Sequence, residues 1–436
     1  MLHHEFRVLS AITAISAGVY GLPRGPGPGP ARQSQFPSVG VPAQNRFGPL
    51  RFRREGTFHV SIFEDLHFGE NAWESWGPQQ DIHSVKVIET ILDAEPRTDL
   101  VVLNGDLITG ENTFLENSTH YVDRIVRPML QRGLTWASTY GNHDNDFNIS
   151  ASAILAREQL WPNARTTQMV SDPGAGVSNY YLPVYAADCH PDQHRHGGCR
   201  PELLLWFFDS RGGFEFQQRD PATGDRVGKR NWVDARVVDW FRHTNAQLVR
   251  AAGGRVIPGL AFVHIPTNAS LALQQKGVDP HRQPGIDDDK PLAQQAQGWC
   301  PDRANDGSRC AYGGQDVPFM QAIASTPGLM ALFSGHDHGD TWCYKWEGLL
   351  PGMTVEGSGV NLCFGQHSGY GGYGSWIRGA RQVVVSLKGL KDLAVDTYIR
   401  LEAGDAVGAV TLNRSYGQDW YPATPNDKTK LPTSGN

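Results

Sequence analysis

Short runs of apolar and β-branched residues recur along the chain, and polar residues follow each of them. Runs of this length that are closed by Gly or Asp are typical of buried β-strands. The runs that predict strands are 58–63, 100–103, 134–140, 203–208, 260–263 and 329–333. Because Asp, Asn or His follows each run within a few residues, the ends of the strands are the candidate places for chemistry.

Helical periodicity appears between these runs. One predicted helix stops before Pro96, and a second covers residues 232–249. The apolar residues at helical spacing are Ile82, Val85, Ile88 and Leu92 in the first helix, and Val233, Val237, Trp240, Phe241 and Leu248 in the second. Alternating strands and helices predict an α/β or α+β layered domain. Open sheets of this kind bind ligands at the carboxyl ends of their strands, where the polar residues stand.

The two ends of the chain differ in composition from its middle. Arg7 precedes an uncharged stretch, and residues 1–22 are predicted to be a signal peptide. Residues 23–55 are rich in Pro and Gly and predict a leader, and residues 416–436 predict a turn-rich tail. Residues 56–415 are predicted to form one catalytic domain. No later run reaches the roughly 18 apolar residues that a membrane span needs, so no span is expected.

The six cysteines favour export, because an even number suits an oxidising compartment. Proximity in the sequence predicts the disulfides Cys189–Cys199, Cys300–Cys310 and Cys343–Cys363, although other pairings stay formally open. Sequons at Asn117, Asn148, Asn268 and Asn413 would carry glycans in a secretory pathway. We therefore expect a secreted glycoprotein, against the alternative of a cytosolic protein whose N-terminal helix is frayed.

Composition bounds the partners. Hydrophobic residues make up 39% of the chain, enough for a sizeable core, while 49 Gly and 28 Pro predict many loops. Lys and Arg number 39 against 45 Asp and Glu, which gives a net charge of −6. Because no broad basic field exists to hold a nucleic-acid backbone, no nucleic-acid partner is expected.

A series of candidate metal ligands follows the predicted strands. In chain order the motifs are Asp65-x-His67, Gly105-Asp106, Gly141-Asn142-His143-Asp144, His264 and Gly335-His336-Asp337-His338. Imidazole and carboxylate ligands together suit Zn, Mn, Fe or Co, whereas Ca and Mg prefer shells of oxygen. A single residue between two ligands directs both side chains to the same face when the segment is extended.

Each motif also has an ordinary structural explanation. A lone Gly-Asp is usually a turn, and a lone buried histidine such as His59 or His264 is more often a satisfied core residue than a ligand. Gly-His-x-His is more specific, because chance gives about 0.07 occurrences in a chain with 49 Gly and 16 His. The appearance of all five motifs in this order, each after a predicted strand, favours a metal site over coincidence.

These motifs resemble the signature of the calcineurin-like metallophosphoesterase family, and the match runs from Asp65 to His338. The local sequences Phe262–Pro266 and the Gly-rich Gly369–Gly374 resemble those of the purple-acid-phosphatase-like branch of this family. The resemblance implies a two-sheet β-sandwich flanked by helices, with a dinuclear metal site at the carboxyl ends of the strands. It implies one metal held by Asp65, His67, Asp106 and His338, and a second held by Asp106, Asn142, His264 and His336.

One departure from the purple enzymes concerns the first metal. Those enzymes carry a Tyr three residues after the bridging Asp, where this chain has Thr109, and they lack the histidine that is present here as His67. The first metal shell therefore resembles that of calcineurin-type enzymes, and a colourless protein is expected. Tyr140, on the strand before Gly141, is expected to pack in the core.

The resemblance also implies a mechanism. Two divalent ions about 3.5–4 Å apart activate a water for attack at phosphorus. His143 would assist the leaving group, and Asp144 would orient its imidazole. We expect a secreted phosphatase acting on small-molecule phosphate monoesters. The alternatives are a phosphodiesterase or nuclease built on the same site, and a non-catalytic secreted protein braced by its metals.

Two other clusters carry weaker signals. Cys189 and Cys199 enclose His190, His194 and His196, which predicts either a small zinc site or a disulfide with solvated histidines, the latter being favoured in an exported protein. Asp287–Asp289 predicts a solvated acidic loop rather than a calcium site.

The residues that follow the metal motifs include Tyr370, Tyr373 and Trp376. These aromatic side chains would either line the pocket or pack within their own loop. Asp209-Ser210 ends a predicted strand without the histidine partner that a serine hydrolase needs, so that class is excluded.

Overall fold

The structure is a computed structural model that describes residues 48–189, 199–291, 300 and 312–429. Residues 42–436 form one compact unit, to which the description below is confined. The predicted signal peptide and most of the predicted leader lie outside the described residues, as do His190, His194, His196 and Cys310.

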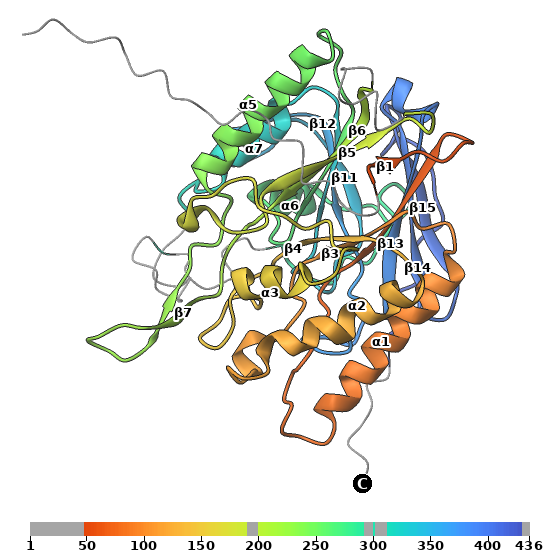
Figure 1. Ribbon diagram of the computed structural model, residues 1–436. Coiled ribbons are helices and arrows are strands. Elements are labelled where there is room, and N and C mark those ends of the chain that lie inside the picture. The colour runs from red at the N-terminus through yellow and green to blue at the C-terminus, as the bar shows by residue number, and fades with distance from the viewer. Residues whose placement is uncertain (1–47, 190–198, 292–299, 301–311, 430–436) are drawn as a thin grey trace, which may run out of the picture. The chain divides into compact units, whose positions relative to one another are not determined.

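Strands in the described part of the chain form two large sheets (Figure 1). The seven-stranded sheet has, in spatial order, β1 (Leu50–Arg51), β5 (Tyr180–Tyr185), β6 (Pro201–Phe208), β9 (Gly259–Val263), β10 (Leu329–Ser334), β12 (Glu356–Phe364) and β11 (Cys343–Leu349). The six-stranded sheet has β15 (Ala406–Leu412), β14 (Val395–Leu401), β13 (Gly379–Ser386), β2 (Thr57–Phe63), β3 (Leu100–Asn104) and β4 (Trp136–Thr139). A separate hairpin pairs β7 (Phe214–Arg219) with β8 (Arg226–Gly228).

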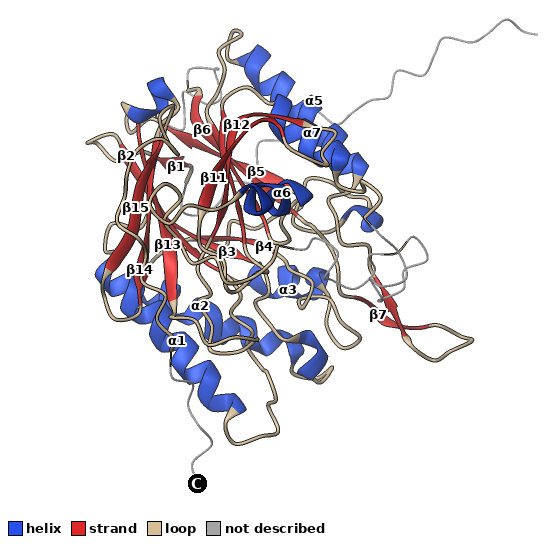
Figure 2. Cartoon of the chain, turned by 180° about the vertical axis from the view of Figure 1, so that it is seen from behind, coloured by secondary structure: helices blue, strands red, loops and turns tan. Residues whose placement is uncertain are grey.

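Helices cover the outer faces of both sheets (Figures 1 and 2). The seven-stranded sheet shares an apolar cluster with α5 (Ala235–Ala251), α6 (Asn268–Lys276) and α7 (Val317–Ser325). The six-stranded sheet shares another with α1 (Gly77–Ala94), α2 (Tyr121–Gln131) and α3 (Ala151–Glu158). A third cluster fills the space between the sheets. The predicted layered α/β fold, a two-sheet sandwich flanked by helices, is confirmed.

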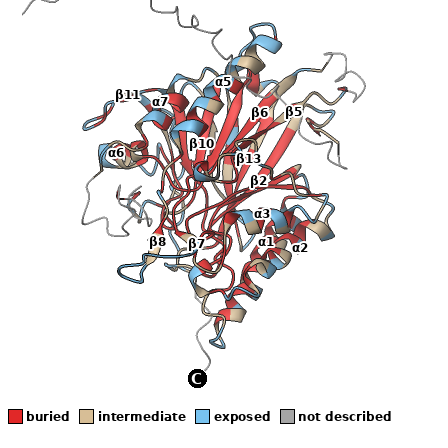
Figure 3. Ribbon diagram, turned by 60° about the vertical axis from the view of Figure 1, so that its left-hand side comes forward, coloured by how far each residue is buried: buried red, intermediate tan, exposed pale blue. Residues whose placement is uncertain are grey.

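Strand β6 shows why its run of apolar residues lacks polar alternation. Leu203, Leu205 and Phe207 belong to the cluster between the sheets, whereas the alternate residues of the strand belong to the cluster under the helices. Successive side chains of a strand point to opposite faces, so a strand buried on both faces is apolar throughout. Figure 3 shows the same contrast, with buried strands and helices whose outer faces are exposed. All six predicted strands are present, as β2, β3, β4, β6, β9 and β10.

Both predicted helices form, but each differs from its prediction. Ile82 of α1 is 53% exposed, because it lies about 120° around the helix from the buried Ile88 and so falls outside the core-facing side. Helix α5 begins at Ala235 rather than at Trp232, because the Asp234 side chain accepts a hydrogen bond from the Arg236 backbone N–H and caps the helix there.

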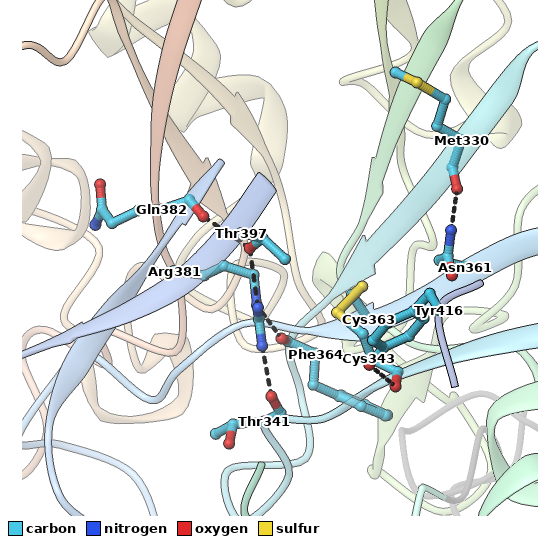
Figure 4. Close-up of a disulfide and its surroundings, with 10 residues drawn as sticks. All are labelled: Met330, Thr341, Cys343, Asn361, Cys363, Phe364, Arg381, Gln382, Thr397 and Tyr416. Atoms are coloured by element: carbon cyan, nitrogen blue, oxygen red, sulfur yellow. Dashed lines mark hydrogen bonds between the residues drawn. A yellow bond between two sulfur atoms is a disulfide. The ribbon is translucent and has the colours of Figure 1, made fainter. Parts of the chain in front are cut away.

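Two predicted disulfides, Cys189–Cys199 and Cys343–Cys363, are present, while the predicted partner of Cys300 lies outside the described residues. Cys343 and Cys363 are directly opposite each other on β11 and β12. Figure 4 shows that this bridge stands beside the buried Arg381, which donates to the backbone carbonyl of Phe364, the residue after Cys363. The hydroxyl of Tyr416 donates to the carbonyl of Cys343, so the first residue of the predicted tail contacts the same strand.

Strand β4 is tied to helix α3 through one buried carboxylate. Trp136, Ser138 and Tyr140 project from one face of the strand, and all three donate hydrogen bonds of 3.0–3.1 Å to Glu158. The hydroxyl of Thr166 donates a fourth, at 2.7 Å. Tyr140 is fully buried, as the sequence predicts. The network fixes the end of β4, directly before Gly141-Asn142-His143-Asp144.

Within the described ranges, no helix is both long enough and apolar enough to cross a lipid bilayer.

We predict that Glu158→Ala lowers the free energy of unfolding by about 3 kcal/mol or more, because it leaves several buried donors without an acceptor. Equilibrium urea unfolding measures the change. Glu202→Ala is the control, since Glu202 pairs with Arg255 at the surface and its loss should cost no more than about 0.5 kcal/mol. Equal losses in the two variants would contradict the role of the Glu158 network.

Candidate metal centre

Five loops, each following a strand, bring the candidate ligands together. Strands β2, β3 and β4 run parallel in one sheet, and β9 and β10 run parallel in the other. Their carboxyl ends carry two groups of side chains with converging ligand atoms: Asp65, His67 and His338, and Asp106, His264 and His336. The site thus draws its residues from both sheets.

Asp106 lies between the two groups. Its Oδ2 is 3.0 Å from His264 Nε2 and 3.7 Å from His67 Nε2. Asp65 Oδ1 also approaches both groups, at 3.6 Å from His338 Nε2 and 3.9 Å from His264 Nε2. Asp106 therefore lies within reach of both groups, and its bridging of two ions stays a prediction of the sequence motif.

Hydrogen bonds to backbone carbonyls determine which ring nitrogen of His264 and of His338 faces the centre. His264 Nδ1 donates to the carbonyl of Asn104 at 2.9 Å, and His338 Nδ1 donates to the carbonyl of Tyr373 at 2.7 Å. Because a carbonyl only accepts, Nδ1 carries a proton in both rings, and Nε2 is the nitrogen that faces the centre. Burial, and next the charge of His143, lower the pKa of His67 to about 3, so this imidazole is neutral, whereas burial of His264 is outweighed by Asp106 and Asp65, which raise its pKa to about 10.

The donor set fits divalent cations. The Nε2 atoms of His67 and His338 are 3.2 Å apart, close enough for one ring to donate a hydrogen bond to the other, and a divalent cation bound by both nitrogens would replace that proton. In the part of the chain that the structure describes, the buried His336 Nε2 and Asn142 Oδ1 have no hydrogen-bond partner. Nitrogen and oxygen donors together match the ions expected from the sequence, namely Zn, Mn, Fe or Co.

The backbone at the centre is strained. Asp65, His67, Asp106 and His336 adopt positive φ values of 53°, 47°, 48° and 75°. Residues with a Cβ rarely occupy this region, and those that do cluster at functional sites. Between Asn104 and Asp106, Gly105 (φ 90°) lies so close to the His264 ring that a Cβ would overlap the imidazole. The Gly-Asp motif therefore contributes a close approach to His264 as well as a turn.

His143 lies at the edge of the centre with its side chain 28% exposed. Its ring centroid is 4.9 Å from that of His67, and its backbone N–H donates to Asp106 Oδ1 at 2.8 Å. Its Nδ1 lies 2.7 and 2.8 Å from the two carboxylate oxygens of Glu111. Burial lowers the pKa of His143, but Asp106 and Glu111 outweigh it and raise the pKa to about 10.

The structure corrects the role predicted for Asp144. Its carboxylate accepts hydrogen bonds of 2.8–3.0 Å from the backbone N–H groups of Leu107, Ile108 and Gly141. Asp144 therefore joins the loop after β3 to the loop after β4, and Glu111 is the carboxylate that orients the His143 imidazole. Sequence motifs did not reveal Glu111, because it lies outside them; its only signal was its place shortly after Gly105-Asp106.

Thr109 also lies in the centre. At the position where purple enzymes have Tyr, its hydroxyl is 3.2 Å from His67 Nδ1.

Of the three aromatic residues noted in the sequence, Tyr370 is buried and its hydroxyl donates to Glu402 at 2.8 Å, whereas Trp376 Nε1 donates to Asp288 at 2.8 Å.

Comparisons with known proteins show to which family the sequence is similar. The family model for calcineurin-like phosphoesterases matches residues 62–340. In Arabidopsis thaliana, "Probable inactive purple acid phosphatase 29" is 25% identical over 367 residues, with 80% of this chain and 81% of the relative covered. "Probable inactive purple acid phosphatase 28" of the same plant is 26% identical over 365 residues, with 78% of each chain covered.

Solved structures are similar at lower identity. A dimetal phosphatase from Danio rerio aligns with a TM-score of 0.46 and 13% identity, covering 82% of this chain and 99% of that chain. A purple acid phosphatase from yellow lupin seeds aligns with a TM-score of 0.44 and 9% identity, covering 84% of this chain and 55% of that chain.

We predict that Asp106→Asn removes both ions, whereas His338→Ala removes about one of the two, because Asp106 is shared between the groups. Metal content per chain, measured by mass spectrometry after gel filtration, is the readout. Retention of one ion in Asp106→Asn would contradict the shared position.

Glu111→Gln should lower the pKa of His143 in the metal-free protein, because it removes one of the two carboxylates that raise it. An NMR titration of the His143 ring proton follows the change. Glu116→Gln, a neutralisation at an exposed position nearby, should leave the pKa where it is in the parent protein. An unchanged pKa in Glu111→Gln would show that another group is the partner.

The active, iron-loaded protein is expected to be colourless. Thr109 has no phenolate to give the charge-transfer band of a purple enzyme, and the hydroxyl of Tyr373 is engaged with Asp289 and with the backbone N–H of His338. A visible spectrum tests this, and a strong band in the purple region would show that a tyrosinate binds iron after all.

Proposed function

Because this chain belongs to the calcineurin-like phosphoesterase family, we propose that it is a secreted enzyme that hydrolyses phosphate monoesters at a dinuclear metal centre. In the proposed site, Asp65, His67, Asp106 and His338 hold one ion, and Asp106, Asn142, His264 and His336 hold the other. Two divalent ions there would lower the pKa of a water and neutralise the charge that develops at phosphorus. The observation that carries the proposal is the His143–Glu111 pair, partly exposed beside both ligand groups.

In this proposal His143 delivers a proton to the leaving group. Glu111 accepts a hydrogen bond from Nδ1–H of His143 and fixes the plane of the ring. Nε2–H is then the group that donates to the leaving-group oxygen. The hydrogen bond from the backbone N–H of His143 to Asp106 sets the distance between the His143 ring and the metal ligands. Asp144 contributes by holding the loop that carries both Asn142 and His143.

The charges around the site disfavour a nucleic-acid substrate. Glu111 lies beside His143, Glu70 binds the backbone of Gly372 next to the first ligand group, and Asp289 contacts Tyr373. Acidic side chains in these places repel a chain of phosphates, and the net charge of −6 adds to that repulsion.

A purely structural role for the metals explains less. A structural brace needs the ligands but has no use for a histidine held by a carboxylate at the edge of the site. The word "inactive" in the names of the Arabidopsis relatives is said of those proteins. Here the His143–Glu111 pair supports catalysis.

Secretion is part of the proposal. The disulfides Cys189–Cys199 and Cys343–Cys363 are compatible with an oxidising compartment. We propose residues 1–22 as signal peptide, 23–55 as leader, 56–415 as the catalytic domain and 416–436 as tail, with glycans on the sequons when the chain is exported.

The test is hydrolysis of p-nitrophenyl phosphate by purified protein supplied with Zn, Mn, Fe or Co. Turnover should exceed that of the diester bis(p-nitrophenyl) phosphate, and failure with all four metals would refute the proposal. The turnover of His143→Ala should fall about 10²–10⁴-fold with phenyl phosphate, whose leaving group is poor, and less with p-nitrophenyl phosphate. A uniform loss, with both ions retained, would assign His143 a role other than protonating the leaving group.

A further inference from the structure

The imidazole of His338 is enclosed by two other rings. The Tyr373 ring is nearly parallel to it, with centroids 4.0 Å apart and an interplanar angle of 12°. The His367 ring lies 3.9 Å away at 40°. Two aromatic rings at these distances cannot occupy the same face of one imidazole, so His338 lies between them. Both rings belong to the segment 367–373, which includes most of the Gly-rich motif noted in the sequence.

Tyr373 also contacts His338 through polar groups. Its carbonyl accepts the Nδ1 proton at 2.7 Å, and its hydroxyl accepts the backbone N–H of His338 at 3.0 Å. The same hydroxyl donates to Asp289, whose loop is held by a hydrogen bond from the Asp288 N–H to the Gly339 carbonyl. One residue therefore fixes the plane, the tautomer and the backbone position of His338.

Glycine allows the segment to come this close. Gly372 has φ 75°, and a Cβ there would lie 2.6 Å from His338 Cε1 and 2.7 Å from His67 Cδ2. Glu70 accepts the N–H of Gly372, and His367 Nε2 donates to the carbonyl of Gly371 at 3.0 Å. The backbone thus lies directly on the rings of two candidate ligands and is held there from both sides.

We propose that Tyr373 and His367 are positioning residues that fix His338 as a ligand of one ion of the dinuclear centre. The inference rests on the proposed function, because it assumes that the centre binds two ions. The second group, Asp106, His264 and His336, is built from other loops, so the effect of the segment should be confined to the ion that His338 binds.

Binding of ¹¹³Cd²⁺ to the full-length protein, followed by NMR, separates the two sites as two resonances. Tyr373→Ala removes the stacked ring and the hydroxyl but keeps the backbone carbonyl, so it should weaken binding at one site by about 10-fold, the lower end of the range for losing an outer contact of a metal-bound histidine, and leave the other within about twofold. Tyr373 is 49% exposed, so loss of its ring opens no cavity in the core. Tyr373→Phe loses only the hydroxyl and keeps the stacked ring, so its binding should weaken less.

Tyr370→Phe is the matched control, since it removes a hydroxyl from the same segment that bonds to Glu402. Both of its sites should bind as in the parent protein. Equal weakening of both sites by Tyr373→Ala, or no weakening, would overturn the inference while leaving the dinuclear centre in place. A parent protein that binds fewer than two ions would instead overturn the proposed function.

Discussion

The structure depends on holding carboxylates and imidazoles close together at a place that water does not reach. His67 and His338 present their Nε2 atoms to each other at 3.2 Å, and Asp65 and Asp106 lie among them, out of contact with water. Such an arrangement forms only where the surrounding chain enforces it. Two sheets, each packed against helices on its outer face, supply that enforcement, and the ligands come from the ends of strands in both.

The connections around the centre serve the same end. The Glu158 network fixes the end of β4, Asp144 joins the loops after β3 and β4, and the Tyr373 and His367 rings enclose His338. The Cys343–Cys363 bridge joins β11, which follows the loop of His336 and His338 in the chain, to β12, which precedes the segment 367–373. Each of these contacts restricts a loop that would otherwise be free to move the ligands apart.

The sequence predicts the parts of this site that follow from periodicity and local motifs. Apolar runs indicate buried strands. Polar residues just after such strands meet at one edge of a parallel sheet, as Asp65, Asp106 and Asn142 do. The partner of His143 could not be predicted, because Glu111 reaches it from a single 3-10 turn, Gly110–Asn112, that no motif marks. Asp144 was misassigned for a related reason: adjacency in sequence suggests contact with His143, whereas the side chain points back to the N–H groups of a neighbouring loop. Ile82 shows the same limit within a helix, where a residue can satisfy the spacing and still lie at the margin of the buried face.

The strained backbone at four candidate ligands has a consequence for the choice of metal. Because positive φ at Asp65, His67, Asp106 and His336 is imposed by the loops, the distances between donors are set before any ion arrives. An ion must then accept the spacing and the angles that the protein offers, and one that prefers another coordination number or radius binds at a disadvantage. In a mixture of competing cations, the protein would retain the ion that best fits the donor spacing as well as the most abundant one. The rigidity of the loops would thus contribute to metal selectivity.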